Sequence, residues 1–188
     1  MLLKYRKFIN EIKINQNNGI SEISKEQLEK NIGFDGNSDE ILRLKSLLRI
    51  LPEYNNITIN FKSNKGGLGY VNSKEYIKDR ILTTIEFNGL PSPEVYVHEL
   101  YHYFTLPALV RPDTPISFEY ISNMQYLYEY SKNRGYSVIN GISIHDTLNE
   151  FCVNITNHKS YNDLLKIGIY DKYLEVTLKF FNSLKLIF

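Results

Sequence analysis

One ten-residue segment, VYVHELYHYF at positions 95–104, constrains the fold more than any other part of the chain. Its side chains are bulky and mostly uncharged. Pro93 and Glu94 precede it, and both favour the first turn of a helix, where a backbone N–H has no partner to lose and an acidic group interacts favourably with the helix dipole. The segment is therefore predicted to be a helix, on which His98 and His102 lie one turn apart on the same face.

Positions 98–102 of this segment have the pattern HExxH. Two imidazoles on one helix face can bind the same tetrahedral zinc ion, and Glu99 lies beside them, within reach of a water on the metal. Zinc lowers the pKa of such a water to about 7, and a glutamate can accept its proton while the metal polarises a carbonyl. The pattern predicts a zinc metallopeptidase. The alternative is a core helix whose histidines are satisfied by hydrogen bonds.

A catalytic zinc site needs a third protein ligand, with water in the fourth position. The longer pattern HExxHxxGxxH is absent, because Thr105 and Ala108 stand where its glycine and third histidine belong. Two glutamates remain. Glu119 follows His102 by 17 residues in the first turn of a predicted helix, and Glu150 follows it by 48 residues beside the apolar side of another. Residue pattern alone does not separate them.

Strand patterns precede the motif. Residues 57–61 (ITINF) alternate and are β-branched, and residues 81–87 (ILTTIEF) form a second run of this kind, ended by Asn88 and Gly89. Ser38 can cap a helix over residues 39–51. These segments predict a small sheet packed against the HExxH helix.

The chain after Phe104 is predicted to be mainly helical. Prolines at positions 107, 112 and 115 predict a loop first, because proline in a helix interior removes a hydrogen bond. Helical patterns follow at about 116–134, 147–157 and 161–184, the last broken near Gly168. A small sheet followed by helices predicts a single α+β domain.

Residues 10–38 are rich in Asn, Ser, Gly, Lys and Glu and contain several turn signals. We expect residues 1–38 to form a loosely packed N-terminal arm with one short helix near residues 25–30. Residues 39–188 are expected to be the domain that carries the motif.

Composition excludes several classes of protein. The chain has 188 residues, 43% of them hydrophobic, which suffices for a packed core. Its formal charge of +1 offers little attraction to nucleic acid. The one cysteine, Cys152, cannot form an internal disulfide and is expected to pack in the core. No apolar run is long enough to span a membrane, and no signal peptide is seen, so we expect a cytoplasmic protein or export by a non-classical or partner-mediated route.

HELYH, the long interval after it and Asn149-Glu150-Phe151 at a helix start resemble the catalytic domain of anthrax toxin lethal factor and its smaller secreted relatives, the Pro-Pro endopeptidases. The resemblance covers about residues 40–188 and implies a zincin-like catalytic domain. In that family the first glutamate of the later helix is the third zinc ligand, and the matching residue is Glu150. The resemblance thus implies one Zn²⁺ ion bound by His98, His102 and Glu150, with Glu99 as general base.

The chain departs from this family at two positions. Asn154 replaces a second glutamate of the ligand helix, and Ser143 replaces a tyrosine that helps to stabilise the oxyanion. His145 and Tyr136 are the nearest substitutes for that tyrosine. We expect His145 to serve, because an imidazole can donate to a developing oxyanion.

Together these features predict a zinc-dependent endopeptidase of the gluzincin type that hydrolyses an internal peptide bond. The resemblance to the lethal factor-like family further implies narrow, toxin-like specificity. Its substrate, a protein or peptide, is expected to lie along an edge strand at residues 81–87. The rival interpretation is a catalytically inactive zincin-like module that binds a protein partner, such as a delivery subunit or an inhibitor. The substitutions at Ser143 and Asn154 keep that interpretation open.

Overall fold

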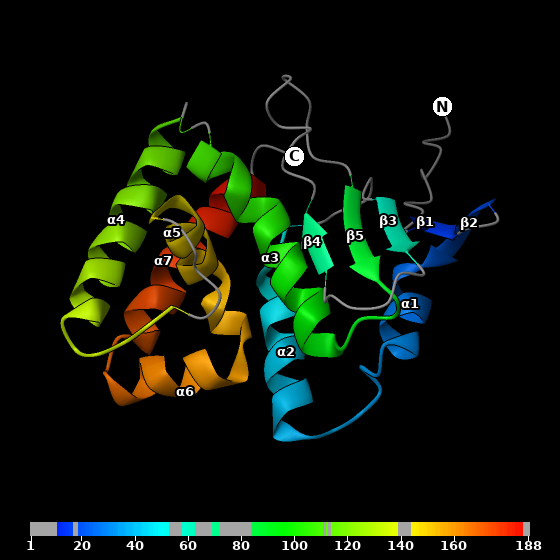
Figure 1. Cartoon of the computed structure of the whole chain (residues 1–188), viewed down its shortest axis with the longest axis horizontal. Coiled ribbons are helices and arrows are strands. Elements are labelled where there is room, and N and C mark those ends of the chain that lie inside the picture. Colours follow the sequence, from blue (N-terminus) through cyan, green and yellow to red (C-terminus); the bar gives the residue numbers. More distant parts are fainter. Residues whose placement is uncertain are drawn as a thin grey trace, which may run out of the picture.

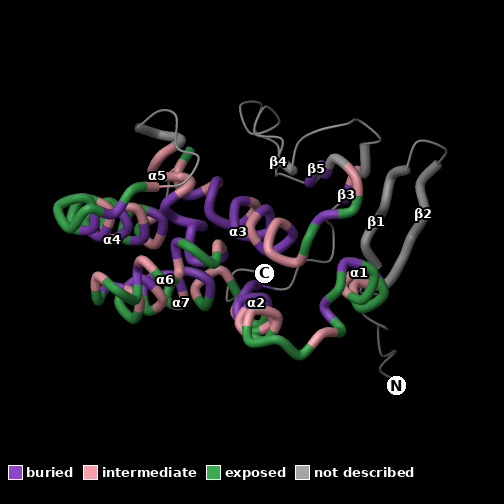
Figure 2. Tube along the Cα trace, turned by 60° about the horizontal axis from the view of Figure 1, so that its bottom comes forward, coloured by how far each residue is buried: buried purple, intermediate pink, exposed green. Residues whose placement is uncertain are grey.

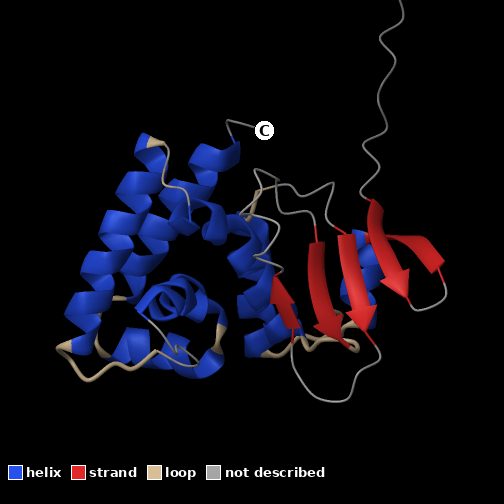
Figure 3. Cartoon of the chain, turned by 45° about the horizontal axis from the view of Figure 1, so that its top comes forward, coloured by secondary structure: helices blue, strands red, loops and turns tan. Residues whose placement is uncertain are grey.

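The computed structural model describes residues 11–16, 19–52, 58–62, 69–71, 84–110, 112, 114–138 and 144–185. A β-sheet lies on one side of the molecule and a group of helices on the other, and the helix α3 (Pro93–Val110) runs between them (Figure 1; Figure 3). The predicted α+β class is confirmed.

In the described part of the chain, the sheet has five strands in the order β2-β1-β3-β5-β4. Their bounds are β1 (Glu11–Gln16), β2 (Gly19–Ser24), β3 (Thr58–Lys62), β4 (Gly69–Val71) and β5 (Thr84–Asn88). The central strands β1, β3 and β5 are parallel, and the outer strands β2 and β4 pair antiparallel with their neighbours. Ile59 of β3 pairs with Ile85 of β5, and both side chains are fully buried, so the β-branched patterns mark the centre of the sheet.

The strand expected at the edge of the sheet is an interior strand. β5 covers positions 84–88 of this prediction, and it pairs with β3 on one side and with β4 on the other; positions 81–83 lie outside the described residues. The edge next to α3 is the short strand β4, which contacts that helix. The residue pattern of positions 81–87 could not predict that β5 is an interior strand. Whether a strand lies at the edge or in the interior depends on which strands pair with it and not on its own side chains.

The remaining helices are α1 (Lys25–Asn31), α2 (Asp39–Ile50), α4 (Pro115–Lys132), α5 (Ile144–Val153), the 3₁₀ turn η2 (Asn154–Thr156), α6 (His158–Lys166) and α7 (Tyr170–Lys185). Side chains cap three of them, and in α2 the predicted Ser38 Oγ accepts from Ile41 N at 3.3 Å. Gly168 separates α6 from α7 with a φ of 73°, a backbone conformation that glycine adopts at no steric cost. In the described part of the chain, no helix combines the length and apolar character that crossing a bilayer requires.

The prediction of a loop directly after Phe104 is wrong, because the helix does not end there. α3 continues through Pro107 to Val110. Proline removes one hydrogen bond from the helix interior, but Leu106 and Ala108 on either side are buried, and their packing favours continuation of the helix.

The core lies around α3, whose residues Tyr96, Val97, Leu100 and Tyr101 are fully buried (Figure 2). The Tyr96 ring packs near the Phe87 ring of β5, with 6.2 Å between the ring centroids. The segment expected to be a loose arm contributes to this same fold: residues 11–16 form β1 and residues 19–24 form β2, and Leu28, Ile32 and Phe34 are buried in the same core cluster. This packing was not predicted because the segment is mostly polar and only a few of its residues, spaced along the chain, are apolar and buried.

Candidate metal centre

Two helices that are distant in sequence bring the predicted ligands together. α3 carries His98 and His102, and α5, which packs against α3, carries Glu150. Phe151, Cys152 and Val153 are fully buried and anchor α5 in the core. Glu150 directly precedes these anchors, and its carboxylate lies against both imidazoles.

The donor atoms of these three side chains lie close together. His98 Nε2 and His102 Nε2 are 3.1 Å apart, and they lie 3.4 and 3.3 Å from Glu150 Oε2 and Oε1. Tetrahedral ligands at the usual zinc distances of about 2.0–2.1 Å lie about 3.3 Å from one another. The side chains of His98, His102 and Glu150 can therefore hold one metal ion.

The site is open on one side. The side chains of His98 and Glu150 are 20% and 19% exposed, whereas that of His102 is 8% exposed. Structural zinc sites are closed by four protein ligands, whereas catalytic sites keep one position for water or substrate. Within the described residues, three side chains with partial solvent access form the group.

Thr156 of η2 sets the orientation and tautomer of His98. Its Oγ1 donates its only proton to the carbonyl of Val153 at 2.8 Å, so it accepts from His98 Nδ1 at 3.1 Å. A neutral imidazole with its proton on Nδ1 has a free lone pair on Nε2. This is the form that binds a metal.

Asn149 fixes the orientation and tautomer of the His102 imidazole in the same way. Its Oδ1 lies 3.0 Å from His102 Nδ1, and an amide oxygen only accepts. Two imidazole lone pairs and a carboxylate thus face one point, where they repel one another unless a cation lies between them.

The charge of Glu150 fits this arrangement. Burial pushes its pKa upward, but hydrogen bonds and positive charge from His102 and His98 outweigh burial and lower the pKa to about 2. Those hydrogen bonds need protons on Nε2, and a metal ion at the same point would favour the ionised carboxylate in their place. Glu150 Oε2 is shielded from solvent, and His98 Nε2 lies 3.4 Å from it.

Glu99, the predicted general base, lies directly after His98 on α3 and is 6% exposed. Its carboxylate is thus adjacent in sequence to a candidate ligand and largely shielded from solvent.

The rival ligand Glu119 lies elsewhere. Its carboxylate is half exposed on α4 and forms an ion pair with Lys179 of α7. The geometry therefore separates the two glutamates that the residue pattern could not, and Glu150 is the one beside the histidines.

The two candidates for the oxyanion differ in what the structure describes. Tyr136 is buried with its ring against Phe151, 5.8 Å between centroids, and burial raises its pKa. No described contact joins it to the three ligands. His145 belongs to the first turn of α5, but its side chain, like all of Ser143, lies outside the described residues.

The residues that orient the histidines were not found from the sequence. Asn154, which replaces a glutamate of the family's ligand helix, has no described hydrogen bond to His98, His102 or Glu150. Asn149 and Thr156 serve instead. Asn149 stands directly before Glu150, and this adjacency is the one signal that could have suggested it.

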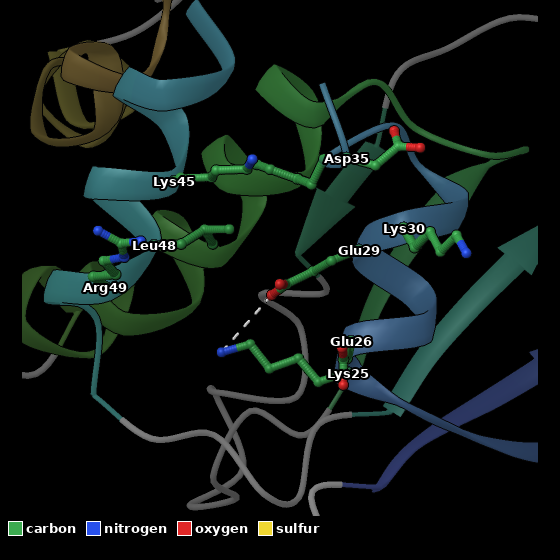
Figure 4. A pocket seen from close by; sticks show the side chains of 9 residues that line it. Lys25, Glu26, Glu29, Lys30, Asp35, Lys45, Leu48 and Arg49 are labelled. Atoms are coloured by element: carbon green, nitrogen blue, oxygen red, sulfur yellow. Dashed lines mark ion pairs between the residues drawn. The ribbon is translucent and has the colours of Figure 1, made fainter. Parts of the chain in front are cut away.

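A cavity of about 450 Å³ lies between α1 and α2, away from this centre (Figure 4). Lysine, arginine and acidic side chains alternate around it, and Lys25 pairs with Glu29 across 3.8 Å. None of the three metal ligands lines it, so its chemistry is separate from that of the metal centre.

Comparison with known proteins found no matching family model, curated protein or solved structure.

Proposed function

We propose that this chain is a zinc-dependent endopeptidase with a zincin-like fold, in which His98, His102 and Glu150 bind one Zn²⁺ ion. The observation that carries the proposal is the cluster of donor atoms: the two imidazole Nε2 atoms are 3.1 Å apart and lie 3.4 and 3.3 Å from the two carboxylate oxygens of Glu150. Glu99, which follows His98 in the chain, is buried. Two imidazoles and one carboxylate suit zinc better than magnesium or calcium, which prefer more oxygen ligands.

Each protein group has a defined task in peptide hydrolysis. Bound zinc would supply a Lewis acid that polarises the substrate carbonyl and acidifies a water. Glu99 accepts a proton from the attacking water as general base and passes it to the leaving amine. Thr156 and Asn149 keep both imidazoles in the ligating tautomer.

His145 is proposed to donate a hydrogen bond to the developing oxyanion. The helix α5 carries both His145 and Glu150, so the donor and the third ligand belong to one rigid element. The burial of Tyr136 against Phe151 makes that hydroxyl the weaker candidate.

The substrate is proposed to bind in extended form along β4. This strand lies at the edge of the sheet and contacts α3, which carries the histidines. An edge strand offers unpaired backbone groups to a peptide, which can add as a further strand. Narrow specificity, and a delivery or inhibitor partner, are extensions from the resemblance to the lethal factor-like enzymes.

The test is metal analysis of the purified chain together with a cleavage screen on peptide libraries. We expect one zinc per chain in the wild type and in Glu99→Gln, with cleavage by the variant reduced by about 10²–10⁴-fold. Glu119→Gln is the matched control, because it removes an equal charge from a half-exposed site. Cleavage that is unchanged in Glu99→Gln would refute the proposed mechanism. Wild-type protein without stoichiometric zinc would favour the inactive, partner-binding module.

A further inference from the structure

The turn η2 holds a ligand-orienting residue that is not part of either ligand helix. Its residues Asn154, Ile155 and Thr156 are 1%, 0% and 0% exposed. The direction of the His98 imidazole depends on where Thr156 Oγ1 lies. Because a 3₁₀ turn has weaker internal hydrogen bonding than an α-helix, its position depends on outside contacts.

Arg43 of α2 supplies such contacts from 112 positions earlier in the chain. Its Nη1 donates to the carbonyl of Ile155 at 2.7 Å, and its Nη2 donates to the carbonyl of Thr156 at 2.8 Å. One rigid guanidinium thus binds two consecutive carbonyls of the turn. A lysine ammonium has no such fixed fork and cannot reproduce this geometry.

The guanidinium is itself held in place. Glu40, one helical turn earlier, accepts from Arg43 Nε at 3.0 Å and from Nη2 at 2.5 Å. The Tyr161 ring of α6 lies under the guanidinium, 4.9 Å from its carbon to the ring centroid. Only 11% of the Arg43 side chain is exposed, so solvent screens these interactions little.

We infer that Arg43 is a positioning residue for the metal centre, acting through η2 and Thr156 on the imidazole of His98. The inference rests on the proposed function, because it assigns Arg43 a part in metal binding. It makes α2 a support of the site although α2 contributes no ligand. A purely structural Arg43 would affect the stability of the fold and leave the metal affinity of the folded chain unchanged.

The experiment measures zinc affinity of the full chain by competition with a chromophoric chelator, and ligand geometry by the visible absorption of the Co²⁺-loaded protein. Circular dichroism confirms that each variant is folded at the assay temperature. The variants are Arg43→Lys, Thr156→Val and the double variant. Arg49→Lys is the matched control, since it makes the same change at an exposed position of the same helix.

We expect Arg43→Lys to weaken zinc binding by about tenfold, at the lower end of the range for residues that orient metal ligands. The double variant should bind zinc no more weakly than Thr156→Val alone, because the two residues act along one route. Arg49→Lys should bind as the wild type does, and the Co²⁺ spectrum should change only in the Arg43 and Thr156 variants.

Wild-type affinity in folded Arg43→Lys would overturn this inference while leaving the metal centre intact, and so would effects that multiply in the double variant. A wild-type chain that binds no metal would overturn both the inference and the proposed function. If Arg43→Lys does not fold, Glu40→Gln replaces it, because this variant loosens the guanidinium and keeps Arg43. A fall in affinity that disappears in the Thr156→Val background supports the inference, and an unchanged affinity overturns it.

Discussion

Replacing Thr156 by Val tests the link between the metal centre and η2 most directly. Valine has nearly the shape of threonine, so the fully buried site keeps its packing. The change removes two hydrogen bonds of the hydroxyl: the one it accepts from His98 Nδ1 at 3.1 Å and the one it donates to Val153 O at 2.8 Å. Water cannot easily replace the hydroxyl at a position that is 0% exposed.

The magnitude follows from these contacts. Without an acceptor at Nδ1, the imidazole of His98 is free to rotate and to adopt the tautomer that has its proton on Nε2 and cannot ligate. Loss of such an orienting partner costs about 10–100-fold in metal affinity, or roughly 1.4–2.8 kcal/mol. The lost bond to Val153 O destabilises the fold by a further amount of about 1 kcal/mol, which the affinity measurement does not contain.

Thr177→Val is the matched control. Thr177 is also 0% exposed, and its Oγ1 donates to the carbonyl of Tyr173 at 3.0 Å within α7. Both variants lose a buried hydroxyl bond to backbone, but only one loses a contact with a ligand. Chelator competition should show weaker zinc binding for Thr156→Val alone, while both variants unfold at a lower denaturant concentration. Equal zinc affinities in the two variants would refute the assigned role of Thr156.

Three further outcomes are expected. Glu150→Ala should lose stoichiometric zinc and Glu119→Ala should retain it, as measured by elemental analysis; full retention in the first would contradict the ligand assignment. Removing zinc with a chelator should lower Tm by about 5–10 °C relative to protein in zinc at about 100 times its Kd, since such a ligand stabilises by about 2.7 kcal/mol; calorimetry showing no shift would oppose a metal bound to the folded state. Burial raises the pKa of Glu40, but hydrogen bonds and charge from Arg43 and His158 outweigh it and hold the pKa below 4.5. The resulting stability is present above pH 4.5 and is lost as the pH falls through the lowered pKa, so Glu40→Gln should flatten the acid limb of urea unfolding below pH 4.5; an unaltered slope would count against this ion pair.

Local patterns could be predicted from the sequence because their causes are local. The spacing of His98 and His102 places both on one helix face through backbone geometry alone. β-Branched runs marked β3 and β5, and the C-terminal helices begin and end close to their predicted bounds. Pro107 is the local signal that misled, since packing of its buried neighbours outweighs one lost hydrogen bond.

The rest of the site depends on which elements pack together, and no local pattern contains that. The residue pattern did not distinguish Glu119 from Glu150 as the third ligand. The packing of α5 on α3 places Glu150 against the histidines. In the same way strand pairing makes β4 the edge, although β5 has the stronger strand signal.

The sequence by itself thus determined the α+β class and the helix that carries HExxH, with His98 and His102 on one face. Only the tertiary structure decided the third ligand and the orienting partners Asn149 and Thr156, and it brought Arg43 onto η2. The reason is physical: a helix face is set by hydrogen bonds four residues apart, whereas Glu150, 48 positions after His102, reaches the histidines only because α5 packs against α3.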